Sequence, residues 1–424
     1  MEVIIEDEKQ LYLDGLGKRA RKAETVLRTM SCDDRNRGLI KAAEALEVRA
    51  EEILMANTAD VEDAKNNGMR EALIDRLKLS KERINAMAEG LRQVAELPDP
   101  VGRVLDEFER PNGLKIRKVS VPMGVIGIIY ESRPNVTADA FALTFKSGNA
   151  VILKGGSDAI NSNKAIVRVI CDALASENLP ADSLLLIEDT DRQTTSKFMK
   201  LRKYVDLLIP RGGANLIRAT VENSTIPVIE TGTGNCHVYV DSAADIDMAV
   251  EIIHNAKTQR MGVCNACESL VIHEAAAGKA IPAIFNDLKA KNIEMRADAR
   301  ARSLCPDMAE ATAEDWGTEY GDAIISIKVV DSLEEAIEHI NRYTTHHSEA
   351  IVTENAANAE KFLNEIDAAA VYVNASTRFT DGFEFGFGAE IGISTQKLHA
   401  RGPMGLNELT SYKFRIMGNG QVRG

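Results

Sequence analysis

Six cysteines are the side chains of this 424-residue sequence best suited to act as nucleophiles. As a thiolate, a cysteine can attack an electrophilic carbonyl carbon and divide one difficult reaction into two easier steps. A chain of this length does not need disulfides, so we expect free thiols in a reducing compartment. From composition alone, we expect each cysteine to be a small buried apolar residue. The six are Cys32, Cys171, Cys236, Cys264, Cys267 and Cys305.

Cys264 and Cys267 form a C-x-x-C pair. A zinc ribbon would need a second close pair, and the sequence has none, so we expect no structural metal. A thioredoxin-like pair would open a helix directly after a strand. Here the pair lies between an expected helix at 244–258 and an expected strand at 268–273, so neither chemistry is favoured.

Composition and missing motifs exclude several classes of protein. The sequence contains no GxGxxG after a strand, no Walker A motif, no GxSxG and no HExxH. It therefore does not favour a standard Rossmann dehydrogenase, a P-loop enzyme or a serine hydrolase. A formal net charge of −13 repels nucleic acid. The sequence has no apolar stretch of membrane-spanning length and no signal-peptide pattern, so we expect a cytoplasmic protein.

The first hundred residues are expected to be helical. Apolar residues recur there at three- and four-residue steps, Ser31 with Asp34 resembles a helix start, and Leu97-Pro98-Asp99-Pro100 ends the segment.

After this segment, short apolar runs alternate with amphipathic stretches, which predicts parallel sheets covered by helices on both faces. The first series has expected strands at 125–130, 150–153, 184–187, 205–209, 228–229 and 238–240, and expected helices near 137–147, 159–177, 191–201 and 213–222. A second series follows a junction around 235–245, with expected strands near 268–273, 324–330, 349–352 and 370–373, and helices near 244–258, 275–290, 332–343 and 355–366.

Two further segments, 114–119 and 407–415, alternate apolar and polar residues like edge strands. They fit neither sheet, and we expect that they could pair with a partner subunit.

Five segments in the same order resemble the aldehyde dehydrogenase superfamily. The segment Thr258–Asn265 resembles its nucleophile loop and singles out Cys264. The others are Val121–Gly127 followed by Asn135, Leu153–Ser157, Val228–Gly232 and Glu319–Gly321. The resemblance implies an α/β fold with two Rossmann-like parallel domains and a small bridging or oligomerisation β element. We therefore expect a cofactor-binding domain at 1–235 with a bridging strand at 110–121, a catalytic domain at 236–400 and a bridging tail at 401–424.

Within the superfamily, nearly the whole chain is similar to the gamma-glutamyl phosphate reductase family, also called glutamate-5-semialdehyde dehydrogenases. The segments typical of it are Tyr130–Thr137, Ile209–Gly213, Gly234–Tyr239, Val373–Gly382 and Leu398–Met404. The resemblance implies NADPH-dependent reduction of L-glutamyl 5-phosphate to the semialdehyde through a thioester on Cys264, the second step of proline biosynthesis. Met261 stands where proline is expected, and Cys267 is not typical of the family, which leaves a disulfide with Cys264 open.

The resemblance also implies roles for other residues. The Asn135 side chain and the Cys264 backbone N–H would stabilise the oxyanion, although Asn135 after Pro134 is also ordinary turn chemistry. Glu230 would act in proton transfer or only position its loop, and both alternatives stay open. Arg133, Thr377 and Arg378 would bind the substrate, because arginine suits its carboxylate and phosphate.

The cofactor residues implied are Lys154, Gly156, Ser157, Gly212, Gly213 and Glu319. NAD-preferring relatives carry an acidic residue where Ser157 stands, so a neutral side chain beside Lys154 favours the 2′-phosphate of NADPH. Gly212 and Gly213 precede an expected helix whose N–H groups could meet the pyrophosphate. Ordinary loops also contain Gly-Gly and exposed lysine, so both alternatives stay open.

Two other functions are considered: non-phosphorylating oxidation of another small aldehyde, and a scaffold that has kept the fold without activity. The expected partners are the small-molecule substrate, further copies of the chain in a homodimer or larger homo-oligomer, and the upstream glutamate kinase, with neither nucleic acid nor membrane.

Overall fold

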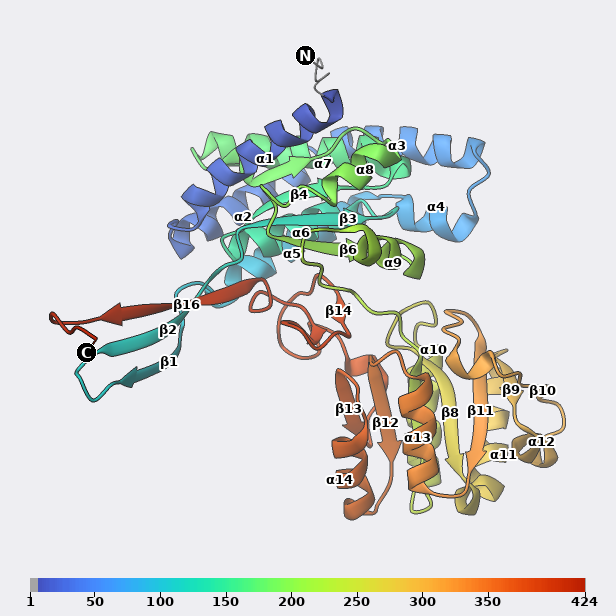
Figure 1. The fold of residues 1–424 in the computed structure, drawn as a ribbon. Coiled ribbons are helices and arrows are strands. Elements are labelled where there is room, and N and C mark those ends of the chain that lie inside the picture. Colours follow the sequence, from blue (N-terminus) through green and yellow to red (C-terminus); the bar gives the residue numbers. More distant parts are fainter. Residues whose placement is uncertain (1–6, 424) are drawn as a thin grey trace, which may run out of the picture. The chain divides into compact units, whose positions relative to one another are not determined.

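The structure is a computed structural model that describes residues 7–423 and divides into two compact units (Figure 1). The first unit comprises the described parts of 1–230, 387–392 and 404–424. The second comprises 231–386 and 393–403. Each unit is described by itself.

The first unit begins with the expected helical region. Its helices are α1 (Glu8–Leu27), α2 (Cys32–Val48), α3 (Ala50–Asn66), α4 (Glu71–Leu77) and α5 (Lys81–Glu96). The expected helix start is confirmed, since Ser31 Oγ accepts the Asp34 N–H at 3.1 Å and satisfies an amide that has no partner inside the helix. The expected end is also confirmed, because α5 stops directly before Leu97 and Pro98.

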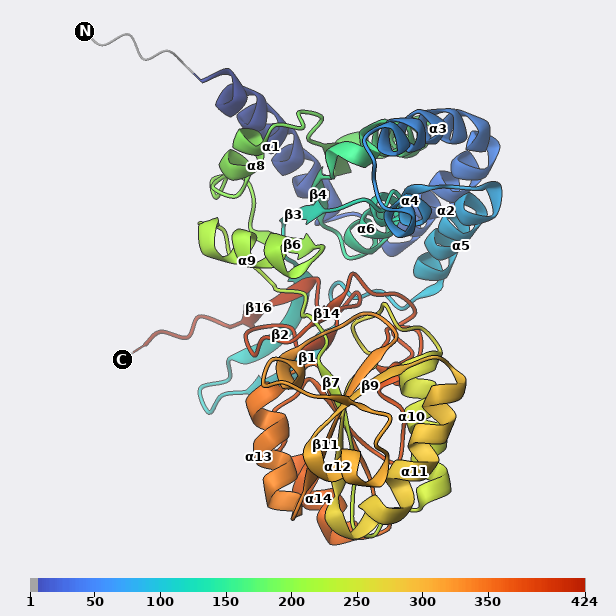
Figure 2. The ribbon, with the colours of Figure 1, turned by 90° about the vertical axis from the view of Figure 1, so that its right-hand side faces the viewer.

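A parallel four-stranded sheet forms the centre of the first unit, in the order β5-β4-β3-β6. Its strands are β3 (Val125–Tyr130), β4 (Ala150–Lys154), β5 (Leu184–Leu186) and β6 (Leu207–Arg211). Helices α6 (Asn135–Lys146), α7 (Ile160–Ser176) and α8 (Arg192–Phe198) connect them, and α9 (Ala214–Asn223) follows β6. Helices α1 and α8 pack together on one side, and α6 and α7 cover the other side with α2, α3 and α5 behind them (Figures 1 and 2). Burial on both faces explains the continuous apolar runs.

The expected strand at 228–229 is wrong. Val228 makes only an isolated bridge to Leu208, at the outer edge of β6. A run of two apolar residues after Pro227 is too short to continue a ladder.

An antiparallel three-stranded sheet completes the first unit, in the order β1-β2-β16. Strand β2 (Lys115–Pro122) pairs along its length with β16 (Thr410–Met417), and β1 (Val104–Glu109) lies on its other side. The expectation that 114–119 and 407–415 are strands outside the two parallel sheets is confirmed. Large apolar side chains remain exposed on this sheet, including Phe108, Tyr412, Phe414 and Ile416.

The second unit is built on a parallel seven-stranded sheet in the order β10-β9-β11-β8-β7-β12-β13. Its strands are β7 (Cys236–Val240), β8 (Cys267–His273), β9 (Glu294–Ala297), β10 (Ala309–Glu310), β11 (Ile324–Val330), β12 (Ser348–Val352) and β13 (Ala370–Val373). The short strands β14 (Ile393–Ser394) and β15 (Gly402–Pro403) form a separate antiparallel pair.

Helices cover both faces of the seven-stranded sheet, and each side has its own hydrophobic core (Figure 2). On one face lie α10 (Ile246–Thr258), α11 (Glu274–Ala290) and α12 (Ala299–Leu304). On the other face lie α13 (Leu333–Tyr343) and α14 (Ala356–Glu365). The expected alternation of strands and helices is therefore confirmed in both units. The strand expected at 238–240 in the first series belongs to the second sheet instead, as β7.

Candidate active site

In the first unit, the loops that follow β3, β4 and β6 meet at the carboxyl edge of the parallel sheet. This edge is where ligands bind in open α/β folds. The Glu131 carboxylate accepts the Gly213 N–H at 2.9 Å, at the N-terminus of α9. A Cβ on Gly212 would stand 2.5 Å from Glu131 Oε2, so a side chain there would displace the Glu131 carboxylate. The loops after β3 and β6 are thereby joined, and Glu131 holds one of the amides expected to meet a pyrophosphate.

Lys154 is the last residue of β4 and is almost completely buried. Its Nζ donates to the Gly155 carbonyl at 3.0 Å, and burial lowers its pKa. Ser157 lies exposed two residues after Gly155. The next residue, Asp158, supplies a carboxylate that accepts a hydrogen bond from Ser132 Oγ in the loop after β3. The neighbourhood of Ser157 therefore contains an acidic group, but that group is held by a serine hydroxyl.

Asn135 is the first residue of α6 and is exposed. Its side-chain amide donates to Asp139 Oδ2, one helical turn further on, at 3.0 Å. Burial raises the pKa of Asp139 to about 6, while the hydrogen bond from Asn135 and the charge of Arg211 oppose that rise. Because the amide has two hydrogens, Asp139 fixes its orientation and leaves a second donor.

The structure places the other two expected residues of the first unit in loops. Arg133 is exposed between β3 and α6, and Glu230 is partly buried just after the Val228 bridge.

In the second unit, Cys264 lies in the loop between α10 and β8, at the amino edge of the seven-stranded sheet. Its side chain is partly accessible. Gly234, just before β7, packs against this loop so closely that a Cβ would overlap the Cys264 carbonyl group. The Gly234 N–H donates to Glu319 Oε1 at 2.9 Å. A single glycine therefore connects the expected nucleophile to the expected ribose-binding glutamate.

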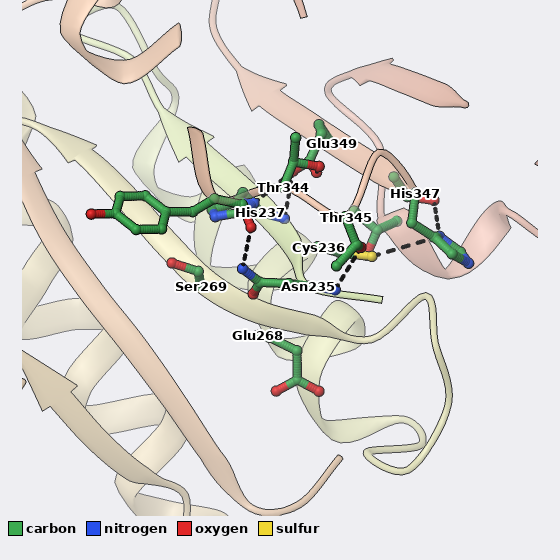
Figure 3. A network of polar contacts seen from close by, with 12 residues as sticks. Asn235, Cys236, His237, Glu268, Ser269, Thr344, Thr345, His347 and Glu349 are labelled. Carbon is green, nitrogen blue, oxygen red and sulfur yellow. Dashed lines mark hydrogen bonds and ion pairs between the residues drawn. The ribbon is translucent and has the colours of Figure 1, made fainter. Parts of the chain in front are cut away.

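The segment after Gly234 is anchored from the opposite side (Figure 3). Asn235 donates from its side chain to the carbonyls of Trp316 and Tyr343, both at 2.9 Å, and its N–H donates to Thr345 Oγ1 at 3.0 Å. Because these partners flank Glu319 on one side and β12 on the other, the position of Gly234 is fixed independently of the cysteine loop.

A buried ion pair lies beneath the turn that carries Glu319. Lys257 Nζ and Glu268 Oε2 are 2.7 Å apart, and both side chains are fully buried. Glu268 also accepts the Gly321 N–H at 3.2 Å. Burial raises the pKa of Glu268, and the Lys257 ammonium opposes that rise. Breaking such a pair leaves an uncompensated charge, so the turn is held firmly to the sheet.

The residue after the nucleophile is also fixed. The Thr377 hydroxyl donates to the Asn265 carbonyl at 2.7 Å, and Asn265 Nδ2 donates to the carbonyls of Arg378 and Thr380 at 3.2 and 3.0 Å. Arg378 donates in return to Asn265 Oδ1 and, at 2.9 Å, to Gln259 Oε1. Thr377 and Arg378, expected to bind substrate, thus hold the cysteine loop in the structure.

Cysteine, histidine and acidic side chains do not gather into a metal site in the part of the chain described, residues 7–423. All six cysteines, including Cys264 and Cys267, are free thiols. None of the helices between residues 7 and 423 combines the length and the apolar character needed to cross a membrane.

The structure thus gathers the expected residues, apart from Glu230, into two groups. Lys154, Gly156, Ser157, Gly212 and Gly213, with Arg133 and Asn135, lie at the carboxyl edge of the first sheet. The second group lies in the second unit. It consists of Cys264 in the cysteine loop and of Glu319, Thr377 and Arg378 around that loop. The supporting residues Glu131, Asp139 and Gly234 were not predicted, although the four-residue spacing of Asn135 and Asp139 on one helix could have indicated that pair.

Comparisons with known proteins show the family of the chain. The model of the aldehyde dehydrogenase family matches residues 7–315 and 308–414. A gamma-glutamyl phosphate reductase of Lachnospira eligens is 61% identical over 411 residues, covering 97% of this chain and 99% of that protein. One of Agathobacter rectalis is 60% identical and covers 95% and 97%. The crystal structure of the Thermotoga maritima gamma-glutamyl phosphate reductase is 53% identical, with a TM-score of 0.96 over 97% of this chain and 100% of that one. The chain therefore belongs to the aldehyde dehydrogenase family, together with these gamma-glutamyl phosphate reductases.

Proposed function

We propose that the protein catalyses the NADPH-dependent reduction of L-glutamyl 5-phosphate to L-glutamate 5-semialdehyde and phosphate, the second step of proline biosynthesis. One observation carries this proposal. Cys264 is partly accessible, and its loop is held by the close approach of Gly234 and by the hydrogen bond from Thr377 to the Asn265 carbonyl. The names of the most similar relatives support the substrate.

The Cys264 thiolate attacks the acyl carbon of the substrate, and phosphate leaves as the thioester forms. Asn135 and the Cys264 N–H are the proposed donors to the oxyanion of the tetrahedral intermediate. Asp139 orients the Asn135 amide for this task. Glu230 acts in proton transfer or positions its own loop, and Arg133, Thr377 and Arg378 bind the carboxylate and phosphate of the substrate.

Members of the aldehyde dehydrogenase family use NAD or NADP, and the residues of the first unit fit such a cofactor. Gly212 leaves the backbone bare beside the Glu131 carboxylate, and α9 presents its N-terminus next to it. Such a cradle suits a pyrophosphate. The bound nicotinamide supplies the hydride that reduces the thioester. Lys154, Gly156, Ser157 and Gly213 are the proposed contacts on the adenosine and phosphate side, and Glu319 on the nicotinamide ribose.

We further propose the division into a cofactor-binding domain at 1–235, with 110–121 as a bridging strand, a catalytic domain at 236–400 and a bridging tail at 401–424. The exposed aromatic and aliphatic side chains of β1 and β16 support a homo-oligomer in which this sheet contacts another copy. A cytoplasmic location and contact with the upstream glutamate kinase belong to the same proposal.

The test is an assay of NADPH consumption. Glutamate kinase and ATP generate the labile acyl phosphate in the same reaction mixture. We expect turnover with the wild-type chain and a loss of about a thousandfold or more in Cys264→Ser, because a hydroxyl is a far weaker nucleophile than a thiolate. Cys171→Ser, which changes a half-buried cysteine of the first unit, is the matched control. Equal turnover in wild type and Cys264→Ser would refute the thioester. Oxidation of the semialdehyde without phosphate would favour a non-phosphorylating enzyme instead.

A further inference from the structure

A second cysteine, Cys236, touches the backbone of the nucleophile. It is the first residue of β7 and is fully buried. Its Sγ lies 3.2 Å from the Cys264 carbonyl oxygen. The same sulfur lies 3.7 Å from His347 Nδ1 (Figure 3). The sulfur therefore fills the space between the cysteine loop and the start of β12.

The direction of the shorter contact follows from protonation. Burial raises the pKa of the Cys236 thiol well above its usual range, and the nearby carboxylate of Glu349 raises it further. Cys236 is therefore a neutral thiol with one hydrogen at physiological pH. A carbonyl oxygen only accepts, so the Cys236 S–H donates to Cys264 O.

A chain of polar side chains holds the far side of the sulfur. Ser348 Oγ lies 2.8 Å from His347 Nδ1 and 2.6 Å from Thr380 Oγ1, and Tyr372 OH lies 2.7 Å from the same Thr380 oxygen. Burial lowers the pKa of His347 to about 4, so its ring is neutral at physiological pH. The ring cannot move without breaking this chain, and Cys236 is confined between it and the carbonyl.

From this geometry we propose that Cys236 is a positioning residue for the nucleophile, acting through the hydrogen bond from its thiol to the Cys264 carbonyl. The inference rests on the proposed function of Cys264 and extends it. Gly234 sets how closely β7 approaches the loop, and Thr377 fixes the Asn265 carbonyl. Cys236 contacts the carbonyl of Cys264 itself, and so fixes the direction of the peptide that follows the Cα of Cys264.

The neighbouring strand provides a matched control. Cys267 is the first residue of β8, pairs in register with Cys236 and is equally buried. Its Sγ contacts the Ser269 carbonyl at 3.4 Å, and burial raises its pKa to about 12. Replacing either cysteine by alanine removes one buried thiol and leaves a cavity of the same size, but Cys236→Ala alone removes the contact with Cys264.

The experiment compares Cys236→Ala, Cys236→Ser and Cys267→Ala with the wild type by kcat, by KM for NADPH and for the acyl phosphate, and by thermal midpoint. A second readout needs no substrate: the rate at which iodoacetamide alkylates Cys264, followed by mass spectrometry. We expect Cys236→Ala to lower kcat by about tenfold to a hundredfold, the effect of a small displacement of a reacting group, with KM for NADPH unchanged. Cys236→Ser should recover part of the loss, since a hydroxyl still donates to the carbonyl.

The comparison of Cys236→Ala with Cys267→Ala decides the inference. A change in the Cys264 alkylation rate in Cys236→Ala but not in Cys267→Ala supports the inference. Equal effects of the two alanine variants on kcat and alkylation, or wild-type kcat in Cys236→Ala, would overturn it. If Cys236→Ala does not fold, Cys236→Val, which fills the space of the thiol but has no side-chain donor, decides by the same two readouts. Failure of the proposed function would show differently, as turnover that survives Cys264→Ser, while the alkylation comparison would still judge the role of Cys236.

Discussion

Gly234 lies so close to Cys264 that a methyl group on its Cα would overlap the Cys264 carbonyl group. The contact joins two backbones, so no side-chain rotation can relieve it. The same glycine donates its N–H to Glu319, which means that a displacement of Gly234 would move both the cysteine loop and the glutamate.

We therefore expect Gly234→Ala to lower kcat by about a hundredfold, because the loop must shift to admit the methyl group. Gly278→Ala is the control: Gly278 lies inside α11 with open space around it, and alanine there should stabilise the helix by about 0.5–1 kcal/mol. Steady-state kinetics and thermal unfolding of both variants are the measurements. Wild-type kcat in Gly234→Ala would show that the loop tolerates displacement.

Asn135→Ala should lower kcat by about a hundredfold, since loss of one oxyanion donor costs about 3 kcal/mol. The KM for NADPH should stay within about twofold, because the proposed donor acts on the transition state rather than on cofactor binding. Asn66→Ala, at an exposed asparagine at the end of α3, serves as the control. A rise in KM at constant kcat would instead assign Asn135 to substrate binding.

Ser157→Glu should shift cofactor preference from NADPH toward NADH. A carboxylate at this position would repel the 2′-phosphate and accept hydrogen bonds from a free ribose. We expect the ratio of kcat/KM for NADPH over NADH to fall by about tenfold or more, or about 1.4 kcal/mol. Asp158→Asn is the control, because Asp158 is already engaged by Ser132. If Asp158→Asn changes the ratio of kcat/KM for NADPH over NADH as much as Ser157→Glu does, Asp158 rather than Ser157 contacts the ribose.

Asp139→Asn tests the buried carboxyl behind Asn135. The folded-state pKa of Asp139 is about 6, above its ordinary value of 3.8, so the folded protein binds this proton more tightly than the unfolded chain. The contribution of this group to stability therefore falls as the pH rises from about 4 to about 6, and its cost is constant above that range.

Asparagine removes the charge and keeps an oxygen that can accept from Asn135. We expect Asp139→Asn to be more stable than the wild type by about 1–2 kcal/mol at pH 7.5, with the difference vanishing by about pH 4. Denaturant unfolding at several pH values measures this, with the exposed Asp63→Asn as a control. A less stable asparagine variant at pH 7.5 would show that Asp139 is held as a favourable carboxylate.

Local sequence pattern predicted the elements that are buried and continuous. Residues 125–130 form β3 as expected, because an unbroken apolar run must be covered on both faces. The prediction at 205–209 was displaced from β6, which runs on through Pro210 to Arg211. Proline normally ends a strand prediction, but β6 is the last strand of its sheet, where a missing N–H costs little.

The supporting contacts could not be predicted from local pattern. Glu131 reaches Gly213 across 82 positions, and Cys236 reaches Cys264 across 28. Periodicity describes which face of an element is buried, whereas these contacts depend on which loops the topology brings to one sheet edge. The resemblance to known proteins indicated the groups that are proposed to carry the chemistry, and the structure added the groups that contact them.

The pairing of β2 with β16 has a consequence for synthesis on the ribosome. Residues 115–122 emerge early, but their partner strand, residues 410–417, emerges almost three hundred positions later. Until then β2 has an unpaired edge, and such edges are prone to join strands of other chains. The order of synthesis thus leaves this edge open to chaperones, or to a neighbouring nascent chain, until residues 410–417 have been made.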